Sequence, residues 1–242
     1  MNDLTIHVLT LFPGIFESYL KYGVIGRAIE KGVLKTNFVN IRDSAEDLHG
    51  TVDETPYGGG AGMIMKPDIL AKSLKSTLKC CKKKHPEVIL LTPQGRKFDQ
   101  SQANKLSMAE EFIVICGRYR GVDERFRKLY ITDELSIGDY VLSGGEPAAI
   151  VVIDAVARLI PGVLQDFESG IEDSFQENHL DCPWYTRPKV FEGLKVPDIL
   201  LSGNHDEIKK WRREQSLKRT RKRRPDLIDP QNFERNKKKM HK

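Results

Sequence analysis

Cysteine is scarce in this sequence, and its spacing excludes two common kinds of site. The 242 residues include four cysteines, Cys80, Cys81, Cys116 and Cys182, and no two of them form a C-x-x-C motif. This argues against a zinc ribbon and a disulfide framework, and it favours a reducing compartment. The six histidines show no spacing typical of a metal site, so we expect no metal ligands among them.

Signals for export and for membrane insertion are also lacking. The first residues, MNDLTIHVLTLF, contain an acid and no basic segment of the kind that opens a secretory signal. The longest apolar stretch, 147–164, is interrupted by Asp154 and Arg158 and is short for a membrane span. We therefore expect a soluble cytoplasmic protein with no membrane partner.

The two common glycine-rich phosphate motifs, G-x-x-x-x-G-K-[ST] and G-x-G-x-x-G, do not occur. The glycine-rich stretch that is present, SIGDYVLSGGEP (136–147), carries only acidic charges, Asp139 and Glu146. Because an acidic pocket repels polyphosphate, we expect a neutral or cationic ligand. S-adenosylmethionine is a ligand of this kind, since it has an adenine, a ribose and a cationic sulfonium but no phosphate. From the glycines alone, a tight turn that caps the next helix is the alternative.

Charge is distributed unevenly along the chain, although the net charge is only +5. Residues 209–242 hold 15 Lys and Arg against 4 Asp and Glu, so the remainder of the chain is net negative. Ile208, just before this basic segment, and Trp211 and Leu217 within it are spaced to give a helix one apolar stripe and one basic face. The pattern favours a nucleic-acid partner over the alternative, a solvated helix with a basic tail.

The order of apolar runs predicts an α/β fold. Residues 4–12 read as a strand, and residues 87–95 and 111–119 read as strands without a polar face, which is typical of a parallel sheet covered on both sides. Ligands of such folds bind beyond the carboxyl ends of the strands. An acidic, poorly periodic segment then separates a first domain, 1–164, from a small, mainly helical, basic domain, 181–242, with 165–180 as a flexible linker.

Several longer motifs carry a specific resemblance across both domains. They are YGVIGRA (22–28), PYGGGAGM (56–63), LTPQGRKFDQ (91–100), CGRYRGVDERF (116–126), SIGDYVLSGGEPA (136–148), RLIPGVL (158–164), EDSF (172–175), LDCPWYTRP (180–188), LLSGNHDEI (200–208) and WRREQSLKRTRKRRPDL (211–227). With these motifs in this order, the chain resembles the bacterial tRNA (guanine-N1)-methyltransferases of the SPOUT class. The resemblance implies a homodimer of α/β subunits, each with a mainly parallel sheet and a deep trefoil knot, and a helical carboxyl-terminal domain that binds tRNA.

The resemblance also implies the cofactor, its site and the substrate atom. S-adenosylmethionine would bind in the knot, and the methyl acceptor would be ring nitrogen 1 of guanosine at tRNA position 37, next to the anticodon. Three loops would line the cofactor site, with the residues Leu91, Pro93, Gly117, Tyr119, Gly121, Ile137, Gly138, Asp139, Tyr140, Val141, Leu142, Gly144 and Gly145.

The chemistry of the acceptor requires two further groups. Nitrogen 1 carries a proton that a base must remove, and negative charge then builds on the neighbouring oxygen, which requires a cation. The candidate bases are all in the acidic segment: Asp166, Glu168, Glu172, Asp173 and Glu177. Chemistry alone does not choose among them, but the resemblance assigns the role to Asp173. It assigns the cation to Arg158, which lies one helical turn after Asp154 and can pair with it.

One departure from the family pattern concerns a metal ion. Arg120 stands where the family generally has a glutamate that is linked to Mg²⁺ or to the cationic cofactor, and an arginine cannot coordinate a cation. Mg²⁺ is therefore in question, and Arg120 is a candidate contact for the cofactor carboxylate or a tRNA phosphate. Two other interpretations stay open: a SPOUT methyltransferase acting on another RNA, and a non-catalytic RNA-binding protein.

Overall fold

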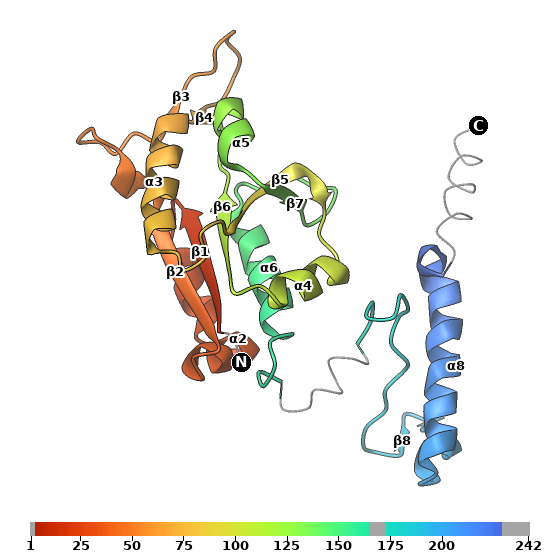
Figure 1. The fold of residues 1–242 in the computed structure, drawn as a ribbon. Coiled ribbons are helices and arrows are strands. Elements are labelled where there is room, and N and C mark those ends of the chain that lie inside the picture. Colours follow the sequence, from red (N-terminus) through yellow and green to blue (C-terminus); the bar gives the residue numbers. More distant parts are fainter. Residues whose placement is uncertain (1–2, 165–172, 229–242) are drawn as a thin grey trace, which may run out of the picture. The chain divides into compact units, whose positions relative to one another are not determined.

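The chain consists of two compact units, Met1–Phe167 and Glu168–Lys242 (Figure 1). The computed structural model describes residues 3–164 and 173–228. Residues 165–172 of the expected linker lie outside this range. Every helix of the described residues is too short or too polar to cross a lipid bilayer.

The first unit is built on a parallel sheet of five strands in the order β2-β1-β6-β5-β7. The strands are β1 (Leu4–Thr10), β2 (Leu34–Asn40), β5 (Glu87–Lys97), β6 (Glu111–Cys116) and β7 (Asp133–Ser136). Every residue of β1 and β6 is buried. This confirms the expectation of a parallel sheet whose central strands have no polar face.

Helices cover both faces of the sheet, and each face has its own apolar core. Leu4, Ile6 and Val8 of β1 point into one core, whereas Leu9 points into the other, as the alternation of side chains along a strand requires. The first core is covered by α1 (Gly14–Leu20), α2 (Gly23–Glu30), α4 (Gln100–Ser107) and α6 (Glu146–Ala157). The second is covered by α3 (Pro67–Cys80) and α5 (Glu124–Tyr130).

Shorter elements complete this unit. A 3₁₀ turn, η1 (Ile41–Ser44), follows β2, and the short strands β3 (Asp53–Glu54) and β4 (Ile64–Met65) pair antiparallel. The glycine-rich stretch at 57–62 is the connection between β3 and β4. The pairing of β3 with β4 therefore fixes the base of this loop within the first unit.

The second unit contains one long helix, α8 (His205–Arg223). The side chain of Asn204 caps this helix by accepting a hydrogen bond from the backbone N–H of Glu207. Its other elements are the hairpin β8 (Val190–Phe191) and β9 (Leu194–Lys195) and the turns η2 (Asp198–Leu201) and η3 (Pro225–Leu227). The mainly helical character expected for this part therefore rests on α8.

The face of α8 that packs in the second unit is more polar than expected. Ile208, Trp211 and Leu217 are only half buried, whereas Ser216 and Thr220 are buried. The Ser216 hydroxyl donates to the Leu180 carbonyl, and the Thr220 hydroxyl accepts from the Leu180 N–H. The predicted apolar stripe therefore packs beside a line of hydrogen bonds, and the basic side chains of α8 stay largely on the exposed side.

Candidate active site

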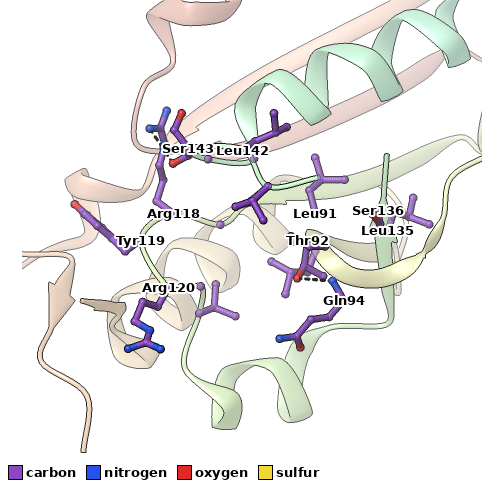
Figure 2. A pocket seen from close by; sticks show the side chains of 18 of the residues that line it. Leu91, Thr92, Gln94, Arg118, Tyr119, Arg120, Leu135, Ser136, Leu142 and Ser143 are labelled. Carbon is purple, nitrogen blue, oxygen red and sulfur yellow. Dashed lines mark hydrogen bonds between the residues drawn. The ribbon is translucent and has the colours of Figure 1, made fainter. Parts of the chain in front are cut away.

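A cavity of the first unit opens where β6 and β7 end and where β5 leaves its ladder. It has a volume of about 480 Å³. Its walls are residues 90–94, at the irregularity within β5, and the ends of β6 and β7 with the segments that follow them, 117–122 and 135–145 in part, with Glu124 and Arg127. Figure 2 shows Thr92 and Gln94 on one side of the hollow and the loop of Arg118, Tyr119 and Arg120 on another. The position agrees with the expectation of a ligand site beyond the carboxyl ends of the strands.

An irregularity in β5 forms one wall. The pairing of β5 with β7 breaks between Leu91 and Arg96, so the intervening residues leave the ladder and lie along the cavity. At Gly95 a β-carbon would lie 2.5 Å from the backbone of Glu134 and Leu135. Only glycine allows β5 to pass this close to β7.

Glycine also closes the opposite wall. A β-carbon at Gly145 would lie 2.7 Å from Cα of Cys116, and the Gly145 N–H donates to the Gly117 carbonyl at 2.9 Å. The next residue back, Gly144, forms a bridge with Arg118. The glycines of the stretch 136–147 therefore bring this segment against the loop that follows β6.

The charge of the cavity differs from the expectation of an acid-lined pocket. The charged lining residues are Arg118, Arg120, Arg127 and Glu124. Glu146 has no exposed surface and turns inward, and Asp139 lies outside the described lining. The expectation of an acid-lined cavity therefore does not hold for Glu146, because this side chain at the start of α6 is buried and does not reach the cavity surface.

Two of the three arginines are bound to acids of the protein itself. Arg118 Nε donates to Glu146 Oε2 at 2.9 Å, and Arg127 makes a two-pronged contact with Glu134. Such pairing holds each guanidinium in one orientation and neutralises much of its charge. Arg118 therefore mainly links the loop after β6 to the start of α6. Its guanidinium carbon also lies 4.5 Å from the centre of the Phe12 ring.

The third arginine, Arg120, lies across the glycine-rich loop that connects β3 and β4 (57–62). Its Nη1 donates to the Ala61 carbonyl at 2.7 Å, and a β-carbon at Gly62 would come within 3.0 Å of its side chain. Its described partner is thus a neutral carbonyl, and the side chain is exposed. Arg120 therefore retains an uncompensated positive charge at the cavity, which suits an anionic group of a ligand.

Neither of two reactive groups near the cavity is ionised at neutral pH. Burial, and next the charge of Glu146, raise the pKa of the Cys116 thiol well above its usual value. Burial, and next the charge of Asp53, raise the pKa of the Tyr119 phenol. Both groups stay protonated, so the geometry does not favour covalent catalysis by a thiolate or phenolate.

Comparison with known proteins agrees with this geometry. The family described as "tRNA (Guanine-1)-methyltransferase TrmD" matches residues 4–230. The chain belongs to this family. A tRNA (guanine-N(1)-)-methyltransferase of Clostridioides difficile (strain 630) is 49% identical over 229 residues, which cover 95% of this chain and 99% of the relative. One of Geobacter sp. (strain M21) is 52% identical over 222 residues, covering 92% and 88%.

Membership in the TrmD family confirms the resemblance and the expectation of an enzyme, a tRNA (guanine-1)-methyltransferase. Around the cavity the structure brings together the residues that the resemblance implied for the cofactor, apart from Gly138 and Asp139. Gly138 adopts a positive φ of 151°, and a β-carbon there would collide with the Tyr140 ring. Gly138 thus shapes the turn, while its neighbours line the cavity.

The two predicted catalytic residues lie in different units. Arg158 follows α6 as its capping residue, is exposed, and donates its backbone N–H to the Asp154 carbonyl at 3.3 Å. Asp173 is half buried at the start of the described part of the second unit, where its carbonyl accepts from the Gln176 N–H. Of the alternative bases, Glu177 is exposed and contacts His179, and the other three lie outside the described residues.

Sequence reasoning missed several lining residues, chiefly Thr92, Gln94, Arg118 and Arg127. Thr92 and Gln94 reach the cavity only because β5 leaves its ladder, which no periodicity signals. Arg118 stands between two predicted residues in the motif CGRYRG, so its position in that loop was the available signal.

Proposed function

We propose that the protein transfers the methyl group of S-adenosylmethionine to ring nitrogen 1 of guanosine at tRNA position 37. The carrying observation is the cavity at the break in β5 and the ends of β6 and β7, in a chain of the TrmD family. Its volume, about 480 Å³, falls within the usual range for small-molecule sites. We place this reaction in the cytoplasm, without a membrane partner.

The cavity residues fit S-adenosylmethionine in chemical terms. Leu91, Leu135 and Ile137 offer apolar surface for the adenine, and the adjacent loop backbone offers N–H and C=O groups for its edge. Arg120, whose described partner is neutral, suits the carboxylate of the methionine part. When bound, the cofactor supplies an electrophilic methyl group on a positively charged sulfur.

We also propose that the cavity walls are the trefoil knot of the SPOUT class. The supporting contacts are the close passage of β5 over β7 at Gly95 and the return of the segment 136–145 to the loop after β6. That return uses Gly144 and Gly145, where a larger residue would strike Arg118 and Cys116. A knot would hold the loops in place before the ligand arrives.

Two side chains would carry the chemistry on guanine. The Asp173 carboxylate would accept the proton of nitrogen 1, which frees the electron pair that forms the new N–C bond. The Arg158 guanidinium would stabilise the negative charge that develops on the neighbouring oxygen. Arg158 suits this role because it is exposed at the end of α6, a helix that packs against the first core.

We further propose that two copies associate through the face of α1 and α6. These helices are neighbours, and the exposed apolar side chains Phe12, Ile15, Tyr19 and Val151 lie on or beside them. Exposed apolar groups gathered in this way favour association. The substrate base would then approach the cofactor of one subunit from the side of its partner. Sedimentation of the purified chain tests this, and a monomer at all concentrations would exclude it.

One assay tests the reaction. Purified protein is mixed with labelled S-adenosylmethionine and tRNA transcripts that carry guanine at position 36 and either guanine or adenine at position 37. We expect transfer to the guanine transcript only. Equal transfer to both would refute the base specificity, transfer to a different RNA alone would favour another substrate, and no transfer would favour a non-catalytic RNA-binding protein.

The role of Asp173 has its own test. Asp173→Asn keeps the shape of the side chain but cannot accept the proton, so turnover should fall by a factor of at least about 10² while cofactor affinity is retained. Glu177→Gln, a substitution of the same kind at an exposed acid of the same segment, serves as the matched control. Retained turnover in Asp173→Asn, or an equal loss in Glu177→Gln, would exclude Asp173 as the base.

A further inference from the structure

Three side chains with metal-binding atoms meet at a place that the methyl-transfer reaction does not use. His7 Nε2 lies 2.9 Å from Glu111 Oε1, and Cys81 Sγ lies 3.7 Å from His7 Nε2. The ligand atoms of all three residues lie within 4.8 Å of one another. His7 and Glu111 are buried, and Cys81 is half buried.

The sheet register explains why these residues meet. Thr5 of β1 pairs with Glu111 of β6, and His7 pairs with Asn37 of β2. Residues two apart on a strand share a face, so the side chains of His7 and Glu111 point to the same side of the sheet. Helix α3 covers that side, and Cys81 directly follows its last residue. Residues far apart in sequence thus converge, which explains why spacing along the chain predicted no metal ligands.

We propose that His7, Cys81 and Glu111 form a binding site for a divalent cation of the zinc class. Imidazole nitrogen, thiolate sulfur and carboxylate oxygen are all established ligands of Zn²⁺, whereas Mg²⁺ and Ca²⁺ prefer oxygen alone. The set leaves a fourth tetrahedral position for a water molecule.

Two of the three distances between ligand atoms suit a tetrahedral ion after a small movement, and the sulfur–oxygen distance is within 4.8 Å. With Zn–S near 2.3 Å and Zn–N near 2.0 Å, ligand atoms around the ion are separated by roughly 3.3–3.6 Å. The sulfur–nitrogen distance of 3.7 Å lies close to this range, and the nitrogen–oxygen distance of 2.9 Å must open by a few tenths of an ångström. The second oxygen of Glu111 accepts from the Lys83 N–H at 2.9 Å and so fixes the carboxylate.

Binding has a balanced proton count. Cys81 releases its thiol proton to solvent, and the imidazole proton of His7 moves to Nδ1 so that Nε2 can coordinate the ion. Asn37 is placed to support this tautomer, since its side-chain amide lies 3.4 Å from His7 Nδ1. Rotation of the amide presents its oxygen as the acceptor for the Nδ1 proton, as outer contacts of zinc-bound histidines commonly do.

The site is separate from the candidate active site. Glu111 is the first residue of β6, whereas the cavity begins beyond the last residue, Cys116. A bound ion would join the end of α3 to the amino-terminal side of β6. The expected role is therefore to stabilise the first unit, because an ion that binds only the folded chain raises its stability.

Cobalt titration of the full chain tests the proposal. Protein treated with a chelator and kept reduced is titrated with Co²⁺, which gives a thiolate-to-metal charge-transfer absorption in the near ultraviolet when sulfur is a ligand. We expect this absorption to saturate at one ion per chain and to disappear when Zn²⁺ is added. The melting temperature of the first unit should rise with free Zn²⁺.

Matched variants identify the ligands. Cys81→Ser should abolish the absorption, whereas Cys80→Ser, at the exposed neighbouring cysteine, should retain it. Glu111→Gln retains the Cys81 thiol, so the absorption can still be measured, and it should weaken Co²⁺ binding by about tenfold or more. This variant serves as the second test if Cys81→Ser does not fold. No absorption in the wild type, absorption retained in Cys81→Ser, or unchanged affinity in Glu111→Gln would overturn the proposal.

Discussion

The buried acid at the start of α6 gives the sharpest test of how the cavity is held together. Glu146 has no exposed surface, and its two oxygens accept from Thr10 Oγ1 at 2.8 Å and from Arg118 Nε at 2.9 Å. Glu146→Gln keeps the size of the side chain but removes its charge and one acceptor oxygen. We expect this single change to destabilise the first unit strongly.

The magnitude follows from burial. Removing one partner of a buried ion pair costs about 3–5 kcal/mol, because the other charge is left without compensation. The Arg118 side chain keeps 19% of its surface exposed and regains some hydration, so the lower end applies, about 3 kcal/mol. For a protein of this size that corresponds to a fall in melting temperature of roughly 6–12 °C.

Thermal unfolding measured by circular dichroism provides the assay. The matched control is Glu46→Gln, whose carboxylate contacts Lys72 Nζ at 3.1 Å with both side chains more than half exposed. Exposed pairs contribute at most about 1 kcal/mol, so the control should melt within roughly 4 °C of the wild type. Equal melting temperatures for the two variants would refute the claim that burial makes the Glu146–Arg118 pair contribute more to stability than an exposed pair does.

Three further predictions concern the cavity and its surroundings. Gly145→Ala should weaken S-adenosylmethionine binding measured by calorimetry, because its β-carbon would strike the strand end, whereas Gly14→Ala, which meets nothing within 4 Å, should not; equal affinities would contradict this. Asp123 caps α5, and its hydrogen bonding to Arg125 lowers the pKa of its carboxyl group. Asp123 therefore stabilises the folded form above the usual carboxyl pKa of about 4, and this stability is lost as pH falls through the lowered pKa of the folded state. Urea unfolding should therefore show Asp123→Ala less stable than wild type by about 1 kcal/mol near neutral pH and a shrinking difference below about pH 4; a difference that grows on acidification would contradict it. Arg120→Glu should make methyl transfer depend more steeply on Mg²⁺ than wild type, and unchanged metal dependence in both would show that this position does not govern metal use.

The sequence predicted the centre of the first unit well because β1, β6 and the first half of β5 are almost entirely buried. The apolar runs at 87–95 and 111–119 match β5 and β6 in position and in their parallel pairing. Hydrophobic content alone determines such strands, since both faces of the sheet are covered. The break in β5 after Leu91 could not be foreseen, because it depends on the backbone contact at Gly95 with a strand that begins near residue 133.

Prediction of the site was limited by side-chain direction. The resemblance implied three loops, and residues of all three line the cavity, but the charge pattern placed Glu146 on the cavity surface, whereas the structure buries it against Thr10. A residue at the mouth of a helix can face either way, and the choice depends on partners that are distant in sequence. The same limit concealed the meeting of His7 with Glu111, which are 104 residues apart.

The departure at Arg120 has a structural counterpart in the glycine loop. Its side chain passes so close to Gly62 that a β-carbon there would lie only 3.0 Å from it, and its Nη1 is held by the Ala61 carbonyl. A long cation therefore fits this position because the facing loop has no side chain at Gly62 and presents a backbone oxygen. A glutamate at 120 would lose that hydrogen bond and place its charge against the same carbonyl oxygen. The loop at 59–62 and Arg120 are thus matched to each other, so Arg120→Glu changes the loop contact as well as the charge of the cavity.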